Sequence, residues 1–150
     1  RAALPASGSA SRAFPMSMSF PDELFYLKNQ GQAELRFDQT MFPHSQKDLL
    51  RSRTVVKLTG DAQAVQNVTI HLVADAVGAA AMALKTDANG EIDDSIPGSP
   101  LAALRGKPMI DRLAVSIAAA DNPQLVKNGV LDLSGLRDVL LFMEYGFTYR

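Results

Sequence analysis

Apolar and polar residues alternate with a period of two in several segments of the chain, a pattern typical of half-buried β-strands. The clearest segment is 32–39, where Ala33, Leu35 and Phe37 share one face and the residues between them are charged. The same alternation predicts a strand over 14–20, with phenylalanine and methionine on one side and serine on the other. Further strands are expected over residues 54–60, 65–75, 80–87, 111–119, 129–135 and 139–147. The alanines of segment 80–87 would fit a helix nearly as well.

Helical periodicity is confined to residues 21–31. Proline occupies the first position, two acidic residues follow in the first turn, and Gly31 can end the helix. Residues 41–52 are irregular, and residues 87–110, rich in Gly, Pro, Asp and Ser, are expected to form a long loop. About seven short strands and one minor helix predict an all-β fold of the β-sandwich or jelly-roll-like type.

The length of 150 residues fits one domain. Residues 1–13 are rich in Ala, Ser and Gly and lack periodicity, so we interpret them as a flexible linker. Residues 14–150 then form a single β-sandwich domain. The chain starts with Arg1 rather than Met, which suggests a processed product or a fragment of a longer chain, with simple trimming as the alternative.

The segment 139–147 is unusually apolar, because Glu144 is its only charged residue. As a strand, it would be apolar on both faces: Val139, Leu141, Met143 and Tyr145 on one, and Leu140, Phe142 and Phe147 wholly or partly on the other. Such a strand belongs in the middle of the fold, or has one face covered by a partner. A helix over 136–145 is the alternative, which the β-branched and aromatic residues disfavour.

Composition excludes some classes of function. The chain is 47% hydrophobic and 21% charged with a net charge of −1, which gives no electrostatic reason to expect nucleic acid as a partner. Its basic segment, Lys47–Lys57, is interpreted as solvated. The chain has no cysteine, so disulfides and thiolate metal sites are excluded. No segment reaches the roughly 20 apolar residues that a membrane span requires.

Candidate chemistry is sparse. The two histidines, His44 and His71, have no spacing typical of zinc ligation, and the sequence contains no nucleophile elbow or phosphate-binding loop. We therefore expect neither an enzyme nor a cofactor. Residues 85–96 partly match a calcium loop, with Asp87, Asn89, Glu91 and Asp93 as weak candidate ligands. Lys85 and Ile96 occupy the two ligand positions that matter most, so an Asn-Gly turn is favoured over a metal site.

The C-terminal segment 128–150 resembles the end of the large A subunits of bacterial insecticidal toxin complexes, the Tc toxins. Those subunits close with a turn, a short strand and a Leu-x-Asp-Val-Ile-Leu-x-x-x-Tyr segment. In this chain the corresponding residues are Leu136, Asp138, Val139, Leu140, Leu141 and Tyr145, with leucine at position 140 where the family more often has isoleucine.

The resemblance implies a non-enzymatic assembly and docking domain of a secreted, extracellular bacterial virulence factor. Such a domain would bind the β-propeller of the B subunit, and the full-length parent would be a homo-oligomer without a membrane span in this segment. The residues then expected to contact the partner are Leu136, Arg137, Phe142 and Tyr145.

Two other functions remain open from the sequence. One is a carbohydrate-binding, lectin-like β-sandwich that uses the residues of the 87–93 loop, with or without calcium. The absence of tryptophan weakens a sugar-stacking site but leaves hydrogen-bonding sites open. The other is a hydrolase built around His71.

Overall fold

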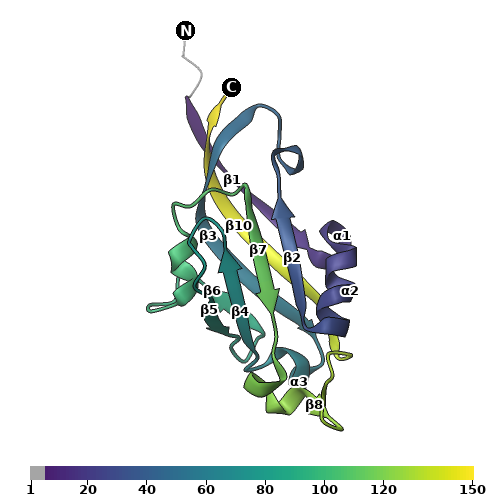
Figure 1. Cartoon of the computed structure of the whole chain (residues 1–150). Helices are drawn as coiled ribbons and strands as arrows, with labels where there is room; N and C mark the ends of the chain where they lie inside the picture. Colours follow the sequence, from purple (N-terminus) through teal and green to yellow (C-terminus); the bar gives the residue numbers. More distant parts are fainter. Residues whose placement is uncertain (1–5) are drawn as a thin grey trace.

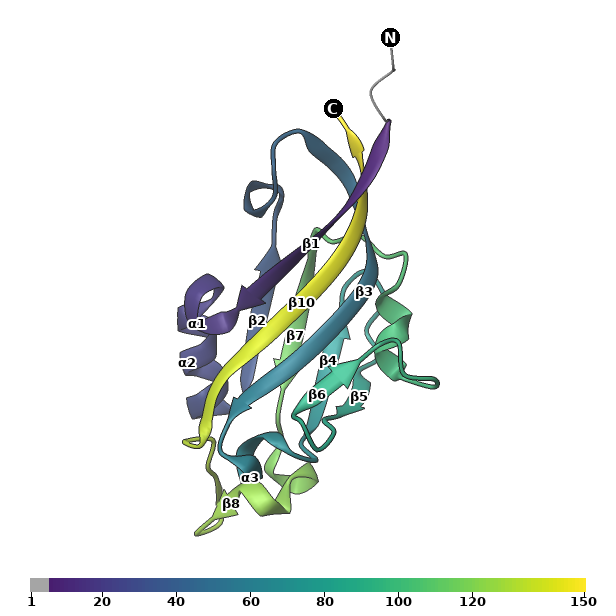
Figure 2. The same cartoon turned by 180° about the vertical axis from the view of Figure 1, so that it is seen from behind.

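The computed structural model describes residues 6–150 and shows two four-stranded antiparallel sheets packed face to face (Figures 1 and 2). Sheet A has the strand order β1 (Ser7–Pro15), β10 (Leu136–Tyr149), β3 (Gln46–Gly60) and β6 (Glu91–Asp93). Sheet B has the order β2 (Gln32–Phe37), β7 (Asp111–Ser116), β4 (Thr69–Ala74) and β5 (Met82–Lys85). A short ribbon pairs β8 (Val126–Lys127) with β9 (Val130–Leu131). The predicted all-β sandwich is thereby confirmed.

The helical segments lie at the margins of the sheets. The α-helices are α1 (Met16–Ser19), α2 (Pro21–Gln30) and α3 (Ala62–Val65), and the 3-10 turns are η1 (Gln39–Met41), η2 (Pro100–Leu104), η3 (Ala119–Asp121) and η4 (Pro123–Leu125). Helix α2 confirms the helix predicted over 21–31, and Gly31 ends it in the left-handed region at φ 76°. Helices α1 and α2 connect β1 of sheet A to β2 of sheet B beside one edge of the sandwich (Figure 1).

The core lies between the two sheets and is built from the inward residues of each alternating strand. Ala33, Leu35 and Phe37 of β2 are buried as the sequence pattern predicts. The facing sheet contributes Val139, Leu141, Met143, Tyr145 and Phe147 of β10. Edge-to-face aromatic pairs such as Phe14–Phe37, with ring centroids 5.2 Å apart, connect the two layers.

The interpretation of residues 1–13 as a flexible linker is wrong for residues 7–13. They belong to β1, which pairs with β10 along its whole length, from Ser7 opposite Thr148 to Pro15 opposite Leu140. Alanine, serine and glycine have weak strand preferences, so this strand depends on the neighbouring β10 rather than on its own pattern. Residues 1–5 lie outside the described residues.

The strand predicted over 14–20 is wrong after Pro15, where the chain turns into α1. Met16 is buried and Met18 is exposed, as the rotation of a helical turn requires. The Asp138 carboxylate accepts a hydrogen bond from the Ser17 backbone N–H at 3.0 Å. This contact joins α1 to the start of β10.

Two segments expected to be irregular contain strands. β3 begins at Gln46, well before the predicted strand at residue 54, and β6 lies inside the expected loop 87–110. The interpretation of Lys47–Lys57 as solvated is also wrong at Arg51, whose side chain is buried against Asp111 with an Nη1–Oδ2 distance of 3.2 Å. The alternation of β3 turns Arg51 toward the core.

Strand β10 lies in the middle of sheet A, between β1 and β3, so the apolar segment 139–147 is a central strand as the sequence indicated. One face is buried in the core, and the other, with Leu140 and Phe142, is half-buried on the outside of the sheet. Figure 2 shows this outer face without a helix lying across it. Within residues 6–150, no helix is long and apolar enough to cross a membrane.

Candidate functional site

The outer face of sheet A is the candidate functional surface and is called the sheet A surface below. Antiparallel pairing aligns its side chains in rows across the strands. One row contains Ala13, Phe142, Val55 and Asp93, and the next contains Pro15, Leu140, Lys57 and Glu91. The centre of the surface is therefore an apolar patch formed by Phe142, Val55 and Leu140, each of them half-buried.

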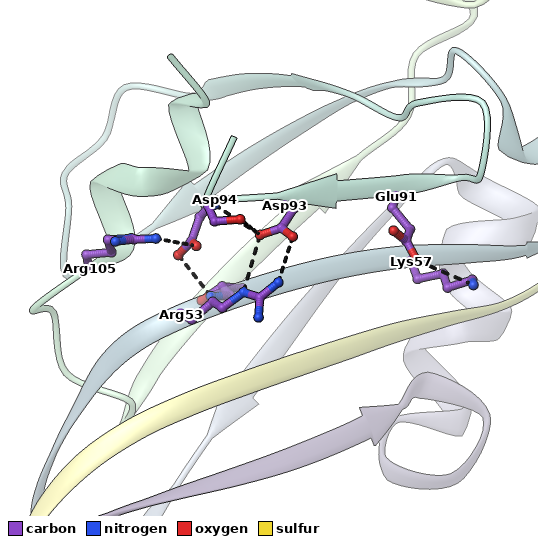
Figure 3. Close-up of polar contacts among 8 residues, drawn as sticks. Arg53, Lys57, Glu91, Asp93, Asp94 and Arg105 are labelled. Atoms are coloured by element: carbon purple, nitrogen blue, oxygen red, sulfur yellow. Dashed lines mark hydrogen bonds and ion pairs between the residues drawn. The ribbon is translucent and has the colours of Figure 1, made fainter. Parts of the chain in front are cut away.

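Ion pairs flank this apolar centre (Figure 3). Arg53 Nη2 lies 2.7 Å from Asp93 Oδ2, and Lys57 Nζ lies 3.5 Å from Glu91 Oε1. The hydrogen bond donated by Arg53, together with the hydrogen bond from the Ser95 backbone, lowers the pKa of Asp93 to about 2. The same contact raises the pKa of Arg53. Both groups are therefore charged at neutral pH.

Asp94 fixes β6 and the loop that follows it against β3. Its side chain is buried and accepts hydrogen bonds from the Thr54 backbone N–H at 2.9 Å and from Arg105 Nη2 at 3.0 Å. The hydrogen bond to Asp94 raises the pKa of Arg105. Because β6 is held in place, Glu91 stays opposite Lys57, and Asp93, which lies opposite Val55, stays within reach of Arg53 (Figure 3).

An apolar centre with fixed charges along one side resembles part of a protein–protein interface, where a desolvated core is bordered by a polar rim. The charges of Arg53, Lys57, Glu91 and Asp93 are already paired within the chain, so they can set orientation without leaving these charges isolated in a complex. This surface can therefore bind a flat, partly apolar protein face.

The four residues predicted to contact a partner do not lie together. Leu136 and Tyr145 are buried core residues, so their assignment to a partner-binding surface is corrected: Tyr145 lies on the inward face of β10, and Leu136, which precedes the register shift between Leu136 and Asp138, is also turned away from solvent. Phe142 lies at the centre of the sheet A surface, and Arg137 is exposed at the start of β10. For these two residues partner binding remains a prediction.

The C-terminal pattern that carries the toxin-complex resemblance is explained mostly by folding. Leu136, Val139 and Leu141 are buried, Tyr145 donates a hydrogen bond from its hydroxyl to Gln46 Oε1 at 2.8 Å, and Asp138 holds α1. Leu140 alone among the positions of that pattern contributes to the apolar centre of the sheet A surface. The pattern therefore consists mostly of residues that stabilise the sandwich, and only Leu140 lies on the sheet A surface.

Sequence reasoning missed the residues of β3 on this surface, Arg53, Val55 and Lys57. The signal was present in the alternation of segment 52–58, in which these three side chains point outward. Their ion-pair partners come from β6, which the sequence pattern did not predict.

The partial calcium loop is a turn between β5 and β6. Asp87 Oδ1 accepts hydrogen bonds from the backbone N–H groups of Asn89 and Glu91, at 2.8 and 3.0 Å. The carboxylates of Glu91 and Asp93 face Lys57 and Arg53, and among the described residues no group of three or more His, Cys, Asp or Glu side chains could hold a metal ion. The weak candidates are thus engaged in closing a turn and in ion pairs.

The two histidines lie apart. His44 is exposed in the turn after η1, whereas His71 points outward from β4, with Nδ1 3.5 Å from Asp121 Oδ2. His71 is on sheet B, so it does not belong to the sheet A surface.

The two sheets define the chain as a small β-sandwich. No protein-family model matches its sequence, and no curated protein sequence matches it significantly. In structure, the chain is similar to part of the cryo-EM structure of Yersinia pseudotuberculosis TcaA–TcaB, with a TM-score of 0.55 and 13% sequence identity. The similarity covers 95% of this chain and 10% of that chain, and at this identity it establishes a common fold alone.

Proposed function

We propose that this chain is a non-enzymatic assembly and docking domain of a large toxin-complex A subunit, and that it binds the β-propeller of the B subunit. The observation that carries the proposal is the structural similarity to TcaA–TcaB. The similarity covers nearly all of this chain and about a tenth of the much longer TcaA–TcaB chain. The resemblance of segment 128–150 to the ends of toxin-complex A subunits supports the same role independently. The parent protein is then a secreted, extracellular homo-oligomer that contributes to virulence.

The sheet A surface is the part of the domain that suits this role. Its apolar centre of Val55, Leu140 and Phe142 supplies area to desolvate, and the flanking ion pairs on β3 and β6 supply a charged rim. A blade of a β-propeller ends in strand edges and loops, which a wide sheet face can contact without rearranging its backbone. Binding through this face needs no catalytic group.

The test compares two substitutions in the full-length parent, with binding to the cognate B–C cocoon measured by biolayer interferometry. Phe142→Asp places a charge in the apolar centre and is expected to weaken binding by about 30-fold, the loss typical of an interface hot spot. Val73→Asp places the same charge on the outer face of sheet B and is expected to leave binding unchanged.

Circular dichroism and thermal unfolding of both variants establish that each is folded before binding is compared. Equal binding by the Phe142→Asp variant and the parent would reject the sheet A surface as the docking face. If the unsubstituted parent did not associate with the cocoon at all, the docking function itself would be rejected.

A further inference from the structure

The outer face of sheet B carries a groove that the docking role does not use. Its volume is about 650 Å³, and helix α2 forms one wall, while Ala81, just before the opposite edge strand β5, lies at the far side. The floor follows two rows of the sheet, Gln32–Ser116–His71 and Glu34–Ala114–Val73. Small side chains on the central strand β7 leave the space that α2 and the outer strands enclose.

The wall of the groove offers an aromatic ring next to amide and carboxylate groups. Tyr26 of α2 lines the groove with 46% of its surface exposed, and Glu23 and Gln30 flank it on the same helix. The floor adds the Gln32 amide, the Ser116 hydroxyl and the His71 imidazole. Hydrogen-bond donors and acceptors are thus interspersed along the groove, beside the flat apolar face of the Tyr26 ring.

The Glu34 and Arg36 charges of the groove are paired within the sheet, whereas Glu23 of α2 has no ion pair among the described residues and adds a negative charge to the wall. Glu34 Oε1 lies 3.0 Å from Arg112 Nη1, and Glu34 Oε2 lies 3.6 Å from Arg36 Nη2. Arg112 also binds both carboxylate oxygens of Asp75, at 3.0 Å each. A phosphorylated or strongly anionic ligand would have to compete with these pairs, so the electrostatics favour an uncharged polar ligand.

The shape of the groove argues against a peptide. An extended peptide adds to a sheet at a free strand edge, whereas this groove lies on the face of three paired strands. An amphipathic helix needs apolar pockets for its anchor residues, and the floor here presents small or polar side chains with one valine. Neither peptide mode matches the amphipathic lining.

We propose that this groove binds a neutral saccharide. The hydroxyl groups of a sugar both donate and accept, as the glutamine amides, the serine and the carboxylates require, and the apolar face of a sugar ring can lie against Tyr26. The site is on the opposite side of the sandwich from the sheet A surface, so a domain bound to a protein partner there can still bind a saccharide. The proposal does not rest on the docking function.

The test begins with a glycan array probed with the 150-residue chain and continues with amide NMR titration. The titrants are soluble neutral oligosaccharides: maltohexaose, cellohexaose, chitohexaose and the neutral glycans found on the array. Because open grooves bind sugars weakly, titration extends to about 10 mM ligand. Binding is expected to shift the amides of residues 32–34, 71–73 and 114–116.

Two matched aromatic substitutions locate the site. Tyr26→Ala removes the ring that lines the groove and is expected to weaken binding by about tenfold. Phe25→Ala removes the neighbouring ring, which is 61% exposed but does not line the groove, and is expected to leave binding unchanged. Ser116→Tyr fills the floor from the central strand, where an aromatic residue is well tolerated, and is expected to abolish binding while the fold is retained.

A blank array together with unshifted amides up to that concentration would overturn the proposal. Shifts confined to the 87–93 turn, or equal losses of binding in the Tyr26→Ala and Phe25→Ala variants, would overturn the assignment to this groove. Selective binding of anionic glycans would overturn the neutral class of ligand. None of these results bears on the association of sheet A with a propeller.

Discussion

Two buried threonines of this sandwich differ in whether their hydroxyl groups are hydrogen-bonded. Thr54 and Thr86 are both 2% exposed. The Thr86 hydroxyl accepts a hydrogen bond from the Val68 N–H at 2.8 Å and donates one to the Val65 carbonyl at 2.6 Å. The Thr54 hydroxyl has no partner among the described residues. The same side chain is therefore satisfied at one position and unsatisfied at the other.

Thr54→Val is expected to raise the free energy of unfolding by about 1 kcal/mol, because valine has nearly the same shape and no unsatisfied hydroxyl. Thr86→Val is expected to lower it by about 2 kcal/mol, since it leaves a buried N–H and a buried carbonyl without partners. Urea unfolding followed by circular dichroism measures both changes. A loss of stability in both variants would mean that the Thr54 hydroxyl has a partner in solution.

Residue-scale burial was predictable wherever a strand alternates cleanly. Ala33, Leu35 and Phe37 lie inside because their neighbours are charged and face solvent. Arg51 was not predictable, because its burial depends on Asp111, 60 positions further along the chain. Burial lowers the pKa of Arg51, although the neighbouring Asp111 carboxylate opposes this effect. A local sequence pattern cannot identify a partner that is so distant in the chain.

At the scale of the element, a helix or strand was predictable from the sequence where the local conformational preference of the residues agrees with their position in the fold. Helix α2 carries its own start and stop signals, and β2 alternates without interruption. In contrast, β1 and β6 depend on strands β10 and β3, to which they pair. Strand β1 is built of serine, glycine and alanine over most of its length, and β6 is three residues long. Neither sequence predicts a strand until its partner is known.

The junction between β3 and β10 requires glycine at position 60. Gly60 has φ 144°, and a Cβ atom there would overlap the carbonyl oxygen of Gly135 and lie 2.9 Å from the Arg137 backbone nitrogen. Gly98 also has a positive φ, at 81°, but a Cβ atom there would meet nothing within 4 Å. Both glycines have a positive φ, but they differ in the space around them.

Gly60→Ala is therefore expected to cost about 3 kcal/mol of unfolding free energy, and Gly98→Ala about 1 kcal/mol. Thermal and urea unfolding of the two variants give the comparison directly. Equal costs at both positions would show that the chain relieves the overlap at Gly60 by moving the backbone of the 135–137 turn.

At the scale of the whole molecule, the sandwich presents two outer faces with different chemistry. The sheet A surface has an apolar centre with paired charges at its side, and sheet B has a groove with amide, hydroxyl and aromatic groups. The sequence indicated that the last strand is central but could not identify the residues beside it, because register across a sheet joins positions far apart in the chain. Val55 and Phe142, opposite each other in neighbouring strands, are one such pair.

Ion pairs across both faces make the stability of the whole domain depend on acid pH. Arg53 holds the pKa of Asp93 at about 2, and the hydrogen bond from Arg112 lowers the pKa of Asp75. An aspartate in the unfolded chain has a pKa of about 3.9. Because the folded values are lower, the unfolded state binds more protons in this range. The stabilisation is therefore complete above about pH 4 to 5 and is lost as the pH falls toward 2.

Urea unfolding at a series of pH values from 7 to 2 is expected to show this loss of stability below about pH 5. Asp93→Asn removes the Asp93 contribution and Arg53→Gln removes its largest cause, while the hydrogen bonds from Ser95 remain, so both variants should lose less stability on acidification than the parent. The difference should be at most about 1 kcal/mol, because the pair is partly exposed and screened by solvent. If the free energy of unfolding of both variants fell with pH as steeply as that of the parent, Asp93 would titrate normally and the ion pair would not be maintained in solution. The sheet A surface would then have a mobile rather than a fixed charge beside its apolar centre.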